Sequence, residues 1–157
     1  GRVYLIEDPA QVVGALGPEP LDDAFTLEAF RARLAGRAGL LKPLLLNQAF
    51  VAGLGNIYAD EALFAAGLHP LRRADSLADE EIARLHRAIR TTLAAGIARE
   101  GASVNWYRKP DGTRGSAQMT LNVYGRADQP CPRCGQPIAR TVIGGRSTHY
   151  CPACQAR

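Results

Sequence analysis

The sequence lacks any apolar run that approaches the roughly 20 residues of a membrane-spanning helix. Its opening residues, GRVY, also lack the basic and apolar regions of a secretory signal peptide. These absences argue against a membrane-spanning or exported protein. We therefore expect no membrane partner and a cytoplasmic or nucleoid location. We also expect a monomer.

Lysine is scarce in this chain. Lys42 and Lys109 are the two lysines among nineteen basic residues. Residues 1–70 have five basic residues against eight acidic ones, whereas residues 71–157 have fourteen against seven. Arginine binds phosphate in a planar, bidentate way that lysine does not match. The second half therefore suits a polyanionic partner, although a solvated basic surface would have the same composition.

Residues 1–25 differ from the rest of the chain. The first six have the composition of a short strand, and turn formers follow at Gly14, Gly17, Pro18 and Pro20. A short strand without a partner is not stable alone. We interpret residues 1–25 as a strand remnant and connector from an N-terminal domain that is missing from this sequence.

Residues 26–120 are predicted to form a helical domain. Thr26 is a candidate N-cap for a helix that ends near Gly36. Pro43 then opens a helix over residues 44–51, which should be buried because it is apolar nearly all round.

A glycine-containing turn at residues 52–55 separates that helix from the next one. Asn56 is predicted to be the N-cap of this second helix, which runs through Ala66 and stops at Gly67. The order is therefore helix, tight turn, helix.

The longest helix is predicted to begin at a pair resembling a capping box, Ser76 and Asp79, and to end at Gly101. Its apolar residues recur at helical spacing: Ile82, Leu85, Ile89, Leu93 and Ile97. Residues 102–122 lack such spacing, so we expect a mobile loop there.

All four cysteines lie in the predicted last domain, residues 121–157, as two C-x2-C pairs separated by sixteen residues: Cys131, Cys134, Cys151 and Cys154. Each C-x2-C turn can point two thiolates at one tetrahedral zinc ion. Between the pairs, two strand-like segments flank Gly144-Gly145, which predicts a β-hairpin. We therefore predict a zinc ribbon whose single Zn²⁺ is structural, because four thiolates leave no open position for water.

Two other uses of these cysteines fit the sequence less well. Two disulfides would need an oxidising compartment, for which there is no export signal. A redox C-x-x-C belongs in a βαβ unit and would not occur twice. His149 is a spare candidate ligand, whereas His69 and His86 suit helix surfaces or structural packing.

Two segments resemble one protein family. The run GLGNIYADEALF at 53–64, followed by His69-Pro70, resembles the helix-two-turn-helix element of formamidopyrimidine-DNA glycosylases. The runs VYGR at 123–126, CPRCG at 131–135 and RSTHYCPACQ at 146–155 resemble their zinc finger. The endonuclease VIII group shares this layout, but GRST at 145–148 is closer to the formamidopyrimidine type. The resemblance implies a mainly α fold: a helix-two-turn-helix domain followed by a small zinc ribbon.

The resemblance also implies a function. Family members extrude an oxidised purine such as formamidopyrimidine or 8-oxoguanine from double-stranded DNA, remove it, and nick the strand. By resemblance, Asn56 binds a DNA phosphate, Lys42 lies near the DNA, and Arg146 binds phosphates and donates a proton in δ-elimination. Read from the residues alone, Asn56 could simply cap its helix and Arg146 could be a solvated hairpin residue. Trp106 and Tyr107 could cover the flipped base or simply pack.

The family nucleophile is an N-terminal proline followed by a glutamate, and neither stands at the start of this sequence. We therefore expect this chain by itself to bind zinc and DNA without glycosylase activity. Two alternatives remain: a stand-alone zinc-ribbon module that binds nucleic acid, and an adaptor whose ribbon binds a protein.

Overall fold

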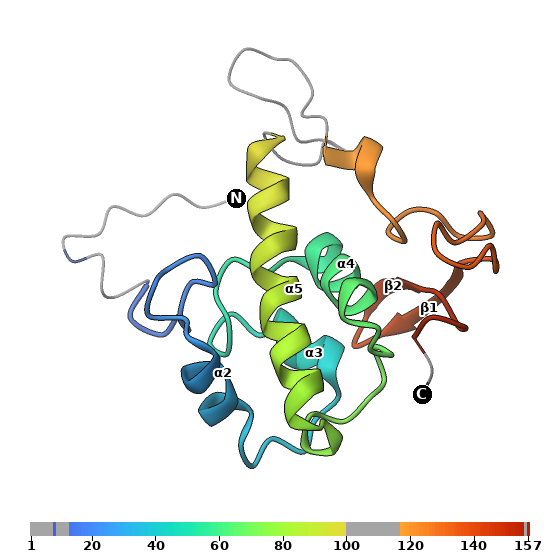
Figure 1. Cartoon of the computed structure of the whole chain (residues 1–157). Helices are drawn as coiled ribbons and strands as arrows, with labels where there is room; N and C mark the ends of the chain where they lie inside the picture. The colour runs from blue at the N-terminus through green and yellow to red at the C-terminus, as the bar shows by residue number, and fades with distance from the viewer. Residues whose placement is uncertain (1–7, 9–12, 100–116, 156) are drawn as a thin grey trace.

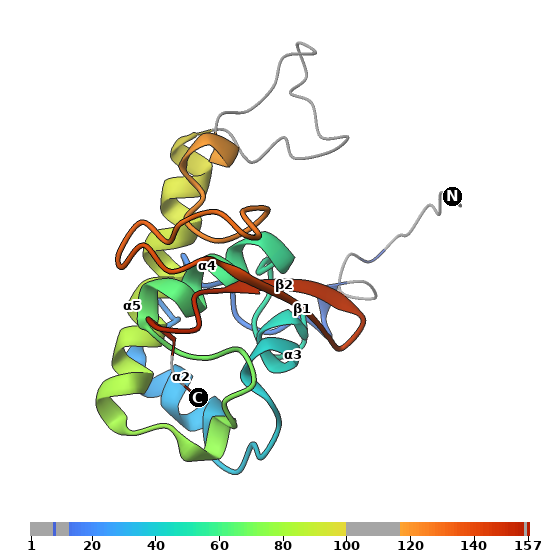
Figure 2. The same cartoon turned by 90° about the vertical axis from the view of Figure 1, so that its right-hand side faces the viewer.

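The computed structural model describes residue 8, residues 13–99, residues 117–155 and residue 157. Its elements, in chain order, are α2 (Leu27–Leu34), α3 (Leu41–Leu46), α4 (Asn56–Ala66), the short 3-10 helix η1 (Ala74–Ser76), α5 (Asp79–Ala98), η2 (Ala117–Thr120), β1 (Ala139–Ile143) and β2 (Arg146–Tyr150). The helix α4 lies between α5 on one side and the β1–β2 hairpin on the other (Figures 1 and 2). The predicted class, mainly helical with a small hairpin ribbon, is confirmed.

The helical part has a hydrophobic core of its own, to which α2, α3, α4 and one face of α5 contribute. Four of the five predicted apolar positions of α5 are buried there: Ile82, Leu85, Ile89 and Leu93. The fifth, Ile97, was expected on the same face, but its side chain is 66% exposed. In Figure 1 the C-terminal end of α5 extends beyond α2, α3 and α4, the helices that share its core.

The segment before α2 packs against the helical part from Gly17 onward. The Gly17 N–H donates to the Gln48 carbonyl at 2.7 Å, and Phe25 is buried and stacked on His86 at 5.0 Å between ring centroids. The strand expected over the first six residues lies outside the described residues, as do Trp106 and Tyr107. None of the described helices is long and apolar enough to cross a membrane.

The helix predicted over residues 44–51 is in fact α3, which starts earlier and stops at Leu46. Two consecutive turns follow. The first is closed by the N–H of Phe50, which donates to the Asn47 carbonyl at 2.8 Å. In the second, Gly53 has a φ of 75°, which only glycine adopts without strain, and its N–H donates to the Gln48 side chain at 2.9 Å. The side chains of Asn47 and Gln48 accept hydrogen bonds from nearby backbone N–H groups, and this local bonding favours turns after Leu46 where the apolar composition predicted more helix.

Two predicted caps are wrong and two are confirmed. Thr26 caps α2, and Gly67 ends α4 in the left-handed conformation. The N-cap of α4 is Gly55, and Asn56 is its first helical residue. Helix α5 begins after Ala78, whose N–H is accepted by the Glu81 carboxylate at 3.0 Å, rather than at Ser76. Because alanine has no side-chain acceptor, only this half of a capping box exists.

The ribbon is an antiparallel hairpin in which Ile143 pairs with Arg146 across the predicted Gly144-Gly145 turn. Both turn glycines have positive φ, as the tight turn requires. The ribbon has a small apolar cluster of its own: Phe64, Val123, Cys131, Ile138 and Cys151. Phe64 comes from α4, and the other four come from the ribbon and the segment that leads into it. The ribbon is therefore packed onto α4 rather than tethered to it.

The close packing of α4 on α5 depends on Gly96. A Cβ atom at this position would lie 2.5–2.6 Å from the ring and hydroxyl of Tyr58. Gly96→Ala should therefore destabilise the protein by about 1–3 kcal/mol through overpacking. This loss outweighs the gain of up to about 1 kcal/mol in helix propensity. Thermal unfolding measures it, with Gly39→Ala as the control because its Cβ would meet nothing within 4 Å. An unchanged midpoint for Gly96→Ala would show that the Tyr58 ring moves aside freely.

Candidate zinc centre and nucleic-acid interface

The two C-x2-C turns bring all four cysteine sulfurs within 4.8 Å of one another. The Sγ atoms of Cys131 and Cys154 are 3.9 Å apart. Those of Cys134 and Cys151 are 3.5 Å apart. Thiolates bound to one zinc ion at about 2.3 Å would be separated by about 3.8 Å in a tetrahedron. The four donors therefore fit a tetrahedral Zn²⁺ site that is closed by protein ligands.

Backbone and side-chain hydrogen bonds hold this sulfur cluster in place. The N–H groups of Arg133 and Cys154 point at cysteine sulfurs, each at 3.4 Å. The buried side chain of Gln155 accepts from the Cys151 N–H at 2.8 Å and donates to the Leu68 carbonyl at 2.9 Å. The second cysteine pair is thus fixed to the segment that follows α4.

Two adjacent carboxylates of α4 join the ribbon to the helical part, a role that the sequence alone did not predict for either of them. The first is Asp60, which is buried. Its Oδ1 pairs with the ammonium group of Lys42 from α3, and its Oδ2 accepts the backbone N–H of His149 in β2 at 2.9 Å. One carboxylate therefore connects α3, α4 and β2.

The second carboxylate is Glu61, which is also buried. It accepts the backbone N–H groups of Asn122, Val123 and Tyr124 and the Asn122 side-chain amide, each at 2.9 Å. These three residues lead from η2 into the ribbon. The carboxylate therefore fixes the point where the chain enters the zinc domain.

Lys42 was expected near DNA, but its side chain is fully buried against Asp60. Burial lowers the pKa of Lys42 and raises that of Asp60, and their mutual attraction opposes both shifts. This placement makes Lys42 a partner of Asp60 inside the protein and argues against contact of its ammonium group with a phosphate. A signal for the buried acids was present in the sequence, because small and apolar residues surround them on α4: Ala59, Ala62 and Leu63.

Arg146 begins β2 directly after the Gly144-Gly145 turn and is exposed. Its guanidinium group forms no hydrogen bond or ion pair with the described part of the chain. One residue further along, the carbonyl of Ser147 accepts from the Asn56 side-chain amide at 3.0 Å. Asn56 therefore does not cap its helix but connects it to the strand that carries Arg146.

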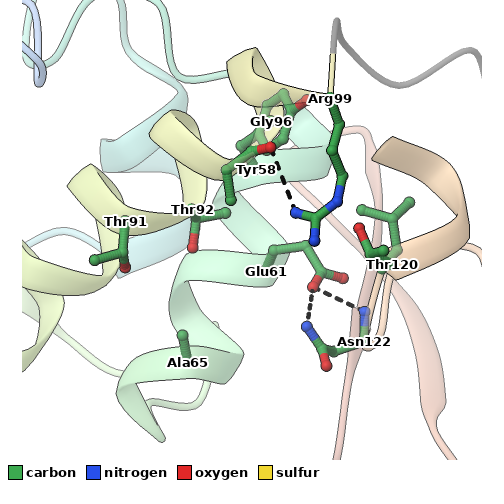
Figure 3. Close-up of a pocket in the computed structure, with 11 residues that line it drawn as sticks. Tyr58, Glu61, Ala65, Thr91, Thr92, Gly96, Arg99, Thr120 and Asn122 are labelled. Atoms are coloured by element: carbon green, nitrogen blue, oxygen red, sulfur yellow. Dashed lines mark hydrogen bonds between the residues drawn. The ribbon is translucent and has the colours of Figure 1, made fainter. Parts of the chain in front are cut away.

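A cavity of about 240 Å³ lies between α4, α5 and residues 120–122 (Figure 3). Tyr58 and Glu61 line it from α4, Thr92 lines it from α5, and Arg99 lines it from the C-cap of α5. The Glu61 carboxylate faces Asn122 across this space, as the dashed lines of Figure 3 show. The cavity thus borders the connection into the ribbon.

Two family profiles together match most of the chain. The formamidopyrimidine-DNA glycosylase H2TH domain matches residues 16–108. A zinc finger found in FPG and IleRS matches residues 128–157, which contain all four cysteines.

Individual relatives agree. The chain is 48% identical over 157 residues to a formamidopyrimidine-DNA glycosylase of Roseiflexus sp. (99% of this chain, 58% of the relative), and 56% identical over 142 residues to that of Heliobacterium modesticaldum (90% and 51%). The MutM (Fpg) crystal structure from Thermus thermophilus superposes with a TM-score of 0.89 at 47% identity, covering 95% of this chain and 58% of that one. A Lactococcus lactis Fpg mutant bound to Fapy-dG-containing DNA gives 0.87 at 39% identity, covering 95% and 55%. The chain thus spans between half and three-fifths of the length of these relatives. The matching profiles, the relatives and the four-sulfur geometry show that the chain belongs to the formamidopyrimidine-DNA glycosylase family and holds one structural zinc ion.

Proposed function

We propose that this chain is the DNA-binding part of a bifunctional glycosylase and AP lyase that removes oxidised purines and nicks the strand. Lactococcus lactis Fpg, with which it superposes, has been crystallised with Fapy-dG-containing and with abasic-site-containing DNA. In this proposal α3, the two turns and α4 form the helix-two-turn-helix element, and the protein acts as a monomer on damaged duplex DNA.

The observation that carries the proposal is the proximity of Arg146 to the N-terminus of α4. The first backbone N–H groups of a helix have no acceptor within it and favour an anion. At α4 the N-cap is Gly55, which has no side chain to satisfy them. The Asn56 side chain donates to the carbonyl of Ser147 in β2, the residue directly after Arg146. The chain therefore brings the exposed residue Arg146 close to the helix N–H groups, with the Asn56 amide between the two elements. This arrangement suits a phosphate.

The acidic residues of α4 do not oppose this use. Asp60 and Glu61 follow Asn56 closely, and if exposed they would repel a phosphate. Both are instead buried, and their oxygens are taken up by Lys42 and by backbone N–H groups of the ribbon. Their negative charge is therefore compensated inside the protein, and the N-terminal end of α4 stays favourable to an anion.

The proposed reaction begins with attack by an amine on the sugar C1′, which expels the base and forms a Schiff base, and elimination then cleaves the strand. We assign Arg146 the donation of a proton in δ-elimination, and Asn56 a phosphate contact. Lys42 does not suit the role of nucleophile, because its amino group is buried and paired with Asp60. We therefore expect this chain to bind DNA without being trapped on it by borohydride.

Arg146→Ala tests the interface. In the full-length enzyme it should leave zinc content and fold intact, because the side chain ligates no metal and is exposed. It should weaken binding of lesion DNA by about 1.5–3 kcal/mol, the value of a hydrogen bond to a charged group. Arg146→Lys should rescue binding only in part, because lysine lacks the planar fork. Fluorescence anisotropy across a salt series measures the affinity and its salt dependence.

The control is Arg140→Ala, which removes the same charge from an exposed residue of the same hairpin, together with a hydrogen bond from Arg140 to the Ser147 hydroxyl at 3.2 Å. Arg140 lies in β1 opposite His149, three positions along the ribbon from the pair that contains Arg146. A loss of affinity well below that of Arg146→Ala is expected. Equal losses would mean that the ribbon contributes only overall charge, and wild-type affinity for Arg146→Ala would leave this arginine a solvated surface residue.

A further inference from the structure

The outer edge of β2 faces α4. Because Ile143 and Arg146 flank a two-residue turn, they form a hydrogen-bonded pair, and the pairs alternate from there along the hairpin. Ser147 and His149 therefore direct their backbone N–H and C=O groups away from β1. These outward groups meet α4: the Ser147 carbonyl accepts from Asn56, and the His149 N–H donates to Asp60. We call this pair of hydrogen bonds the edge contact.

The spacing of the two hydrogen bonds in the edge contact is similar along α4 and along β2. Asn56 and Asp60 are four residues apart on a helix, a rise of about 6 Å. Ser147 and His149 are two residues apart on a strand, a rise of about 6.6–6.8 Å. The strand can therefore run alongside the first turn of α4 with one hydrogen bond at each end. Together with the packing of Phe64 in the ribbon cluster, the two attachments fix both the position and the direction of β2.

Of the two hydrogen bonds in the edge contact, the one between Asp60 and His149 is more deeply buried and more rigidly held. The Asp60 carboxylate is buried and held by the Lys42 ammonium on its other oxygen. The His149 side chain is also buried, with its ring edge-on to Tyr124 at 5.0 Å between centroids. Asn56 is only half-buried, at the outer end of the contact. Arg146 precedes Ser147 by one residue, so its backbone position depends on this alignment.

We propose that Asp60 is a positioning residue: through the His149 N–H it aligns β2 along α4 and so sets Arg146 beside the helix N-terminus. This inference rests on the proposed function, since it concerns the same anion-binding surface. Asp60 itself is buried, so we expect no direct contact between its carboxylate and DNA. Its effect on affinity is transmitted along three residues of β2, which the β1–β2 pairing keeps extended.

Asp60→Leu alone would leave the Lys42 charge buried without a partner, and such a variant could fail to fold. The test therefore compares two double variants of the zinc-loaded chain, Lys42→Met/Asp60→Asn and Lys42→Met/Asp60→Leu. Both remove the buried ion pair, and any direct effect of Lys42 cancels in the comparison. They differ at residue 60 in the acceptor: asparagine retains an oxygen for the His149 N–H and for the nearby His149 Nδ1, 3.5 Å from Asp60 Oδ2 in the unsubstituted protein, whereas leucine is apolar and somewhat larger.

The Leu variant should bind a lesion-containing duplex about tenfold or more weakly than the Asn variant, as for a misplaced charge-assisted contact. Both should retain one zinc per chain and the same helix content. Amide exchange at His149 should be faster in the Leu variant, and the NOE contacts between Ser147 and the first turn of α4 should weaken. Equal affinity and equal NOE patterns in two folded, zinc-loaded variants would overturn the proposal.

The unsubstituted chain provides a second test that needs no folded variant. The His149 amide should exchange slowly although it lies on the outer edge of a two-stranded sheet, whereas the Ser147 amide on the same edge should exchange fast. Exchange of His149 at the rate of an unstructured amide would also overturn the proposal. These measurements involve no DNA. If the unsubstituted chain fails to bind DNA while the His149 amide is protected, the proposed function fails and the alignment of β2 stands.

Discussion

Replacing Cys151 by serine, or removing zinc with a strong chelator, should unfold the ribbon while the helices persist. Structural zinc contributes on the order of 10 kcal/mol to the folding of small zinc domains. A hairpin of two five-residue strands over a small apolar cluster cannot replace that contribution. The hydrophobic core of the helical part, by contrast, draws its residues from Phe25 to Leu93 and includes none from the ribbon.

Metal analysis, far-UV circular dichroism and amide exchange together measure this result. Pro152→Ala is the control, because this exposed residue lies between two cysteine ligands and is not one itself. Control protein should retain one zinc per chain and a protected hairpin. If the Cys151→Ser protein also retained stoichiometric zinc and an ordered hairpin, the four-thiolate assignment would be wrong.

Loss of zinc should also lower the melting temperature of the helices. When the ribbon unfolds, Asp60 loses the His149 N–H and Glu61 loses its three backbone donors. Both carboxylates then face water instead of the protein, and Lys42 is opened to solvent with them. The helical part should therefore survive as a less stable unit, with its amides exchanging fastest in α4.

Features set by neighbours in sequence could be predicted. The spacing of the cysteines identified the sulfur cluster, Gly144-Gly145 identified the hairpin turn, and Thr26 and Gly67 marked helix ends. Each depends on residues within one turn or one hairpin. Caps were less certain, because several polar residues near a helix start compete for the same N–H groups. At α4 the N-cap is Gly55, and the Asn56 side chain donates to Ser147 instead. At α5 the Glu81 carboxylate accepts the Ala78 N–H, where Ser76 had been expected to take part.

The connection between helices and ribbon could not be predicted. It depends on partners far apart in sequence: Asp60 and His149 are separated by 89 residues, and Glu61 and Asn122 by 61. The apolar neighbours of Asp60 and Glu61 on α4 indicate that the two acids are buried, but they do not indicate which donors satisfy the carboxylates. Only when the ribbon is placed beside α4 do they acquire buried donors. The same proximity pairs Lys42, a candidate DNA contact in the sequence, with Asp60 inside the protein.

Glu61→Ala should be among the most damaging single substitutions on α4, although the residue ligates no zinc and its carboxylate faces the ribbon rather than the proposed DNA surface. It would leave three backbone N–H groups and one side-chain amide without their acceptor. Each buried donor left unpaired costs about 1–3 kcal/mol. Water from the adjacent cavity can satisfy some of them, so we expect a net loss of about 3 kcal/mol or more.

Glu61→Gln should fall between Glu61→Ala and the unsubstituted protein. Its amide keeps one acceptor oxygen, but it turns an NH₂ group toward backbone donors. Glu80→Ala is the matched control, because this exposed glutamate lies in the first turn of α5 and its loss should cost within about 0.5 kcal/mol. Urea unfolding monitored by circular dichroism gives the free energies, and amide exchange at Val123 and Tyr124 reports the entry into the ribbon directly. If Glu61→Ala unfolds at the same urea concentration as Glu80→Ala and both amides stay protected, then the zinc site alone holds the backbone of residues 122–124, and the Glu61 carboxylate does not contribute to stability.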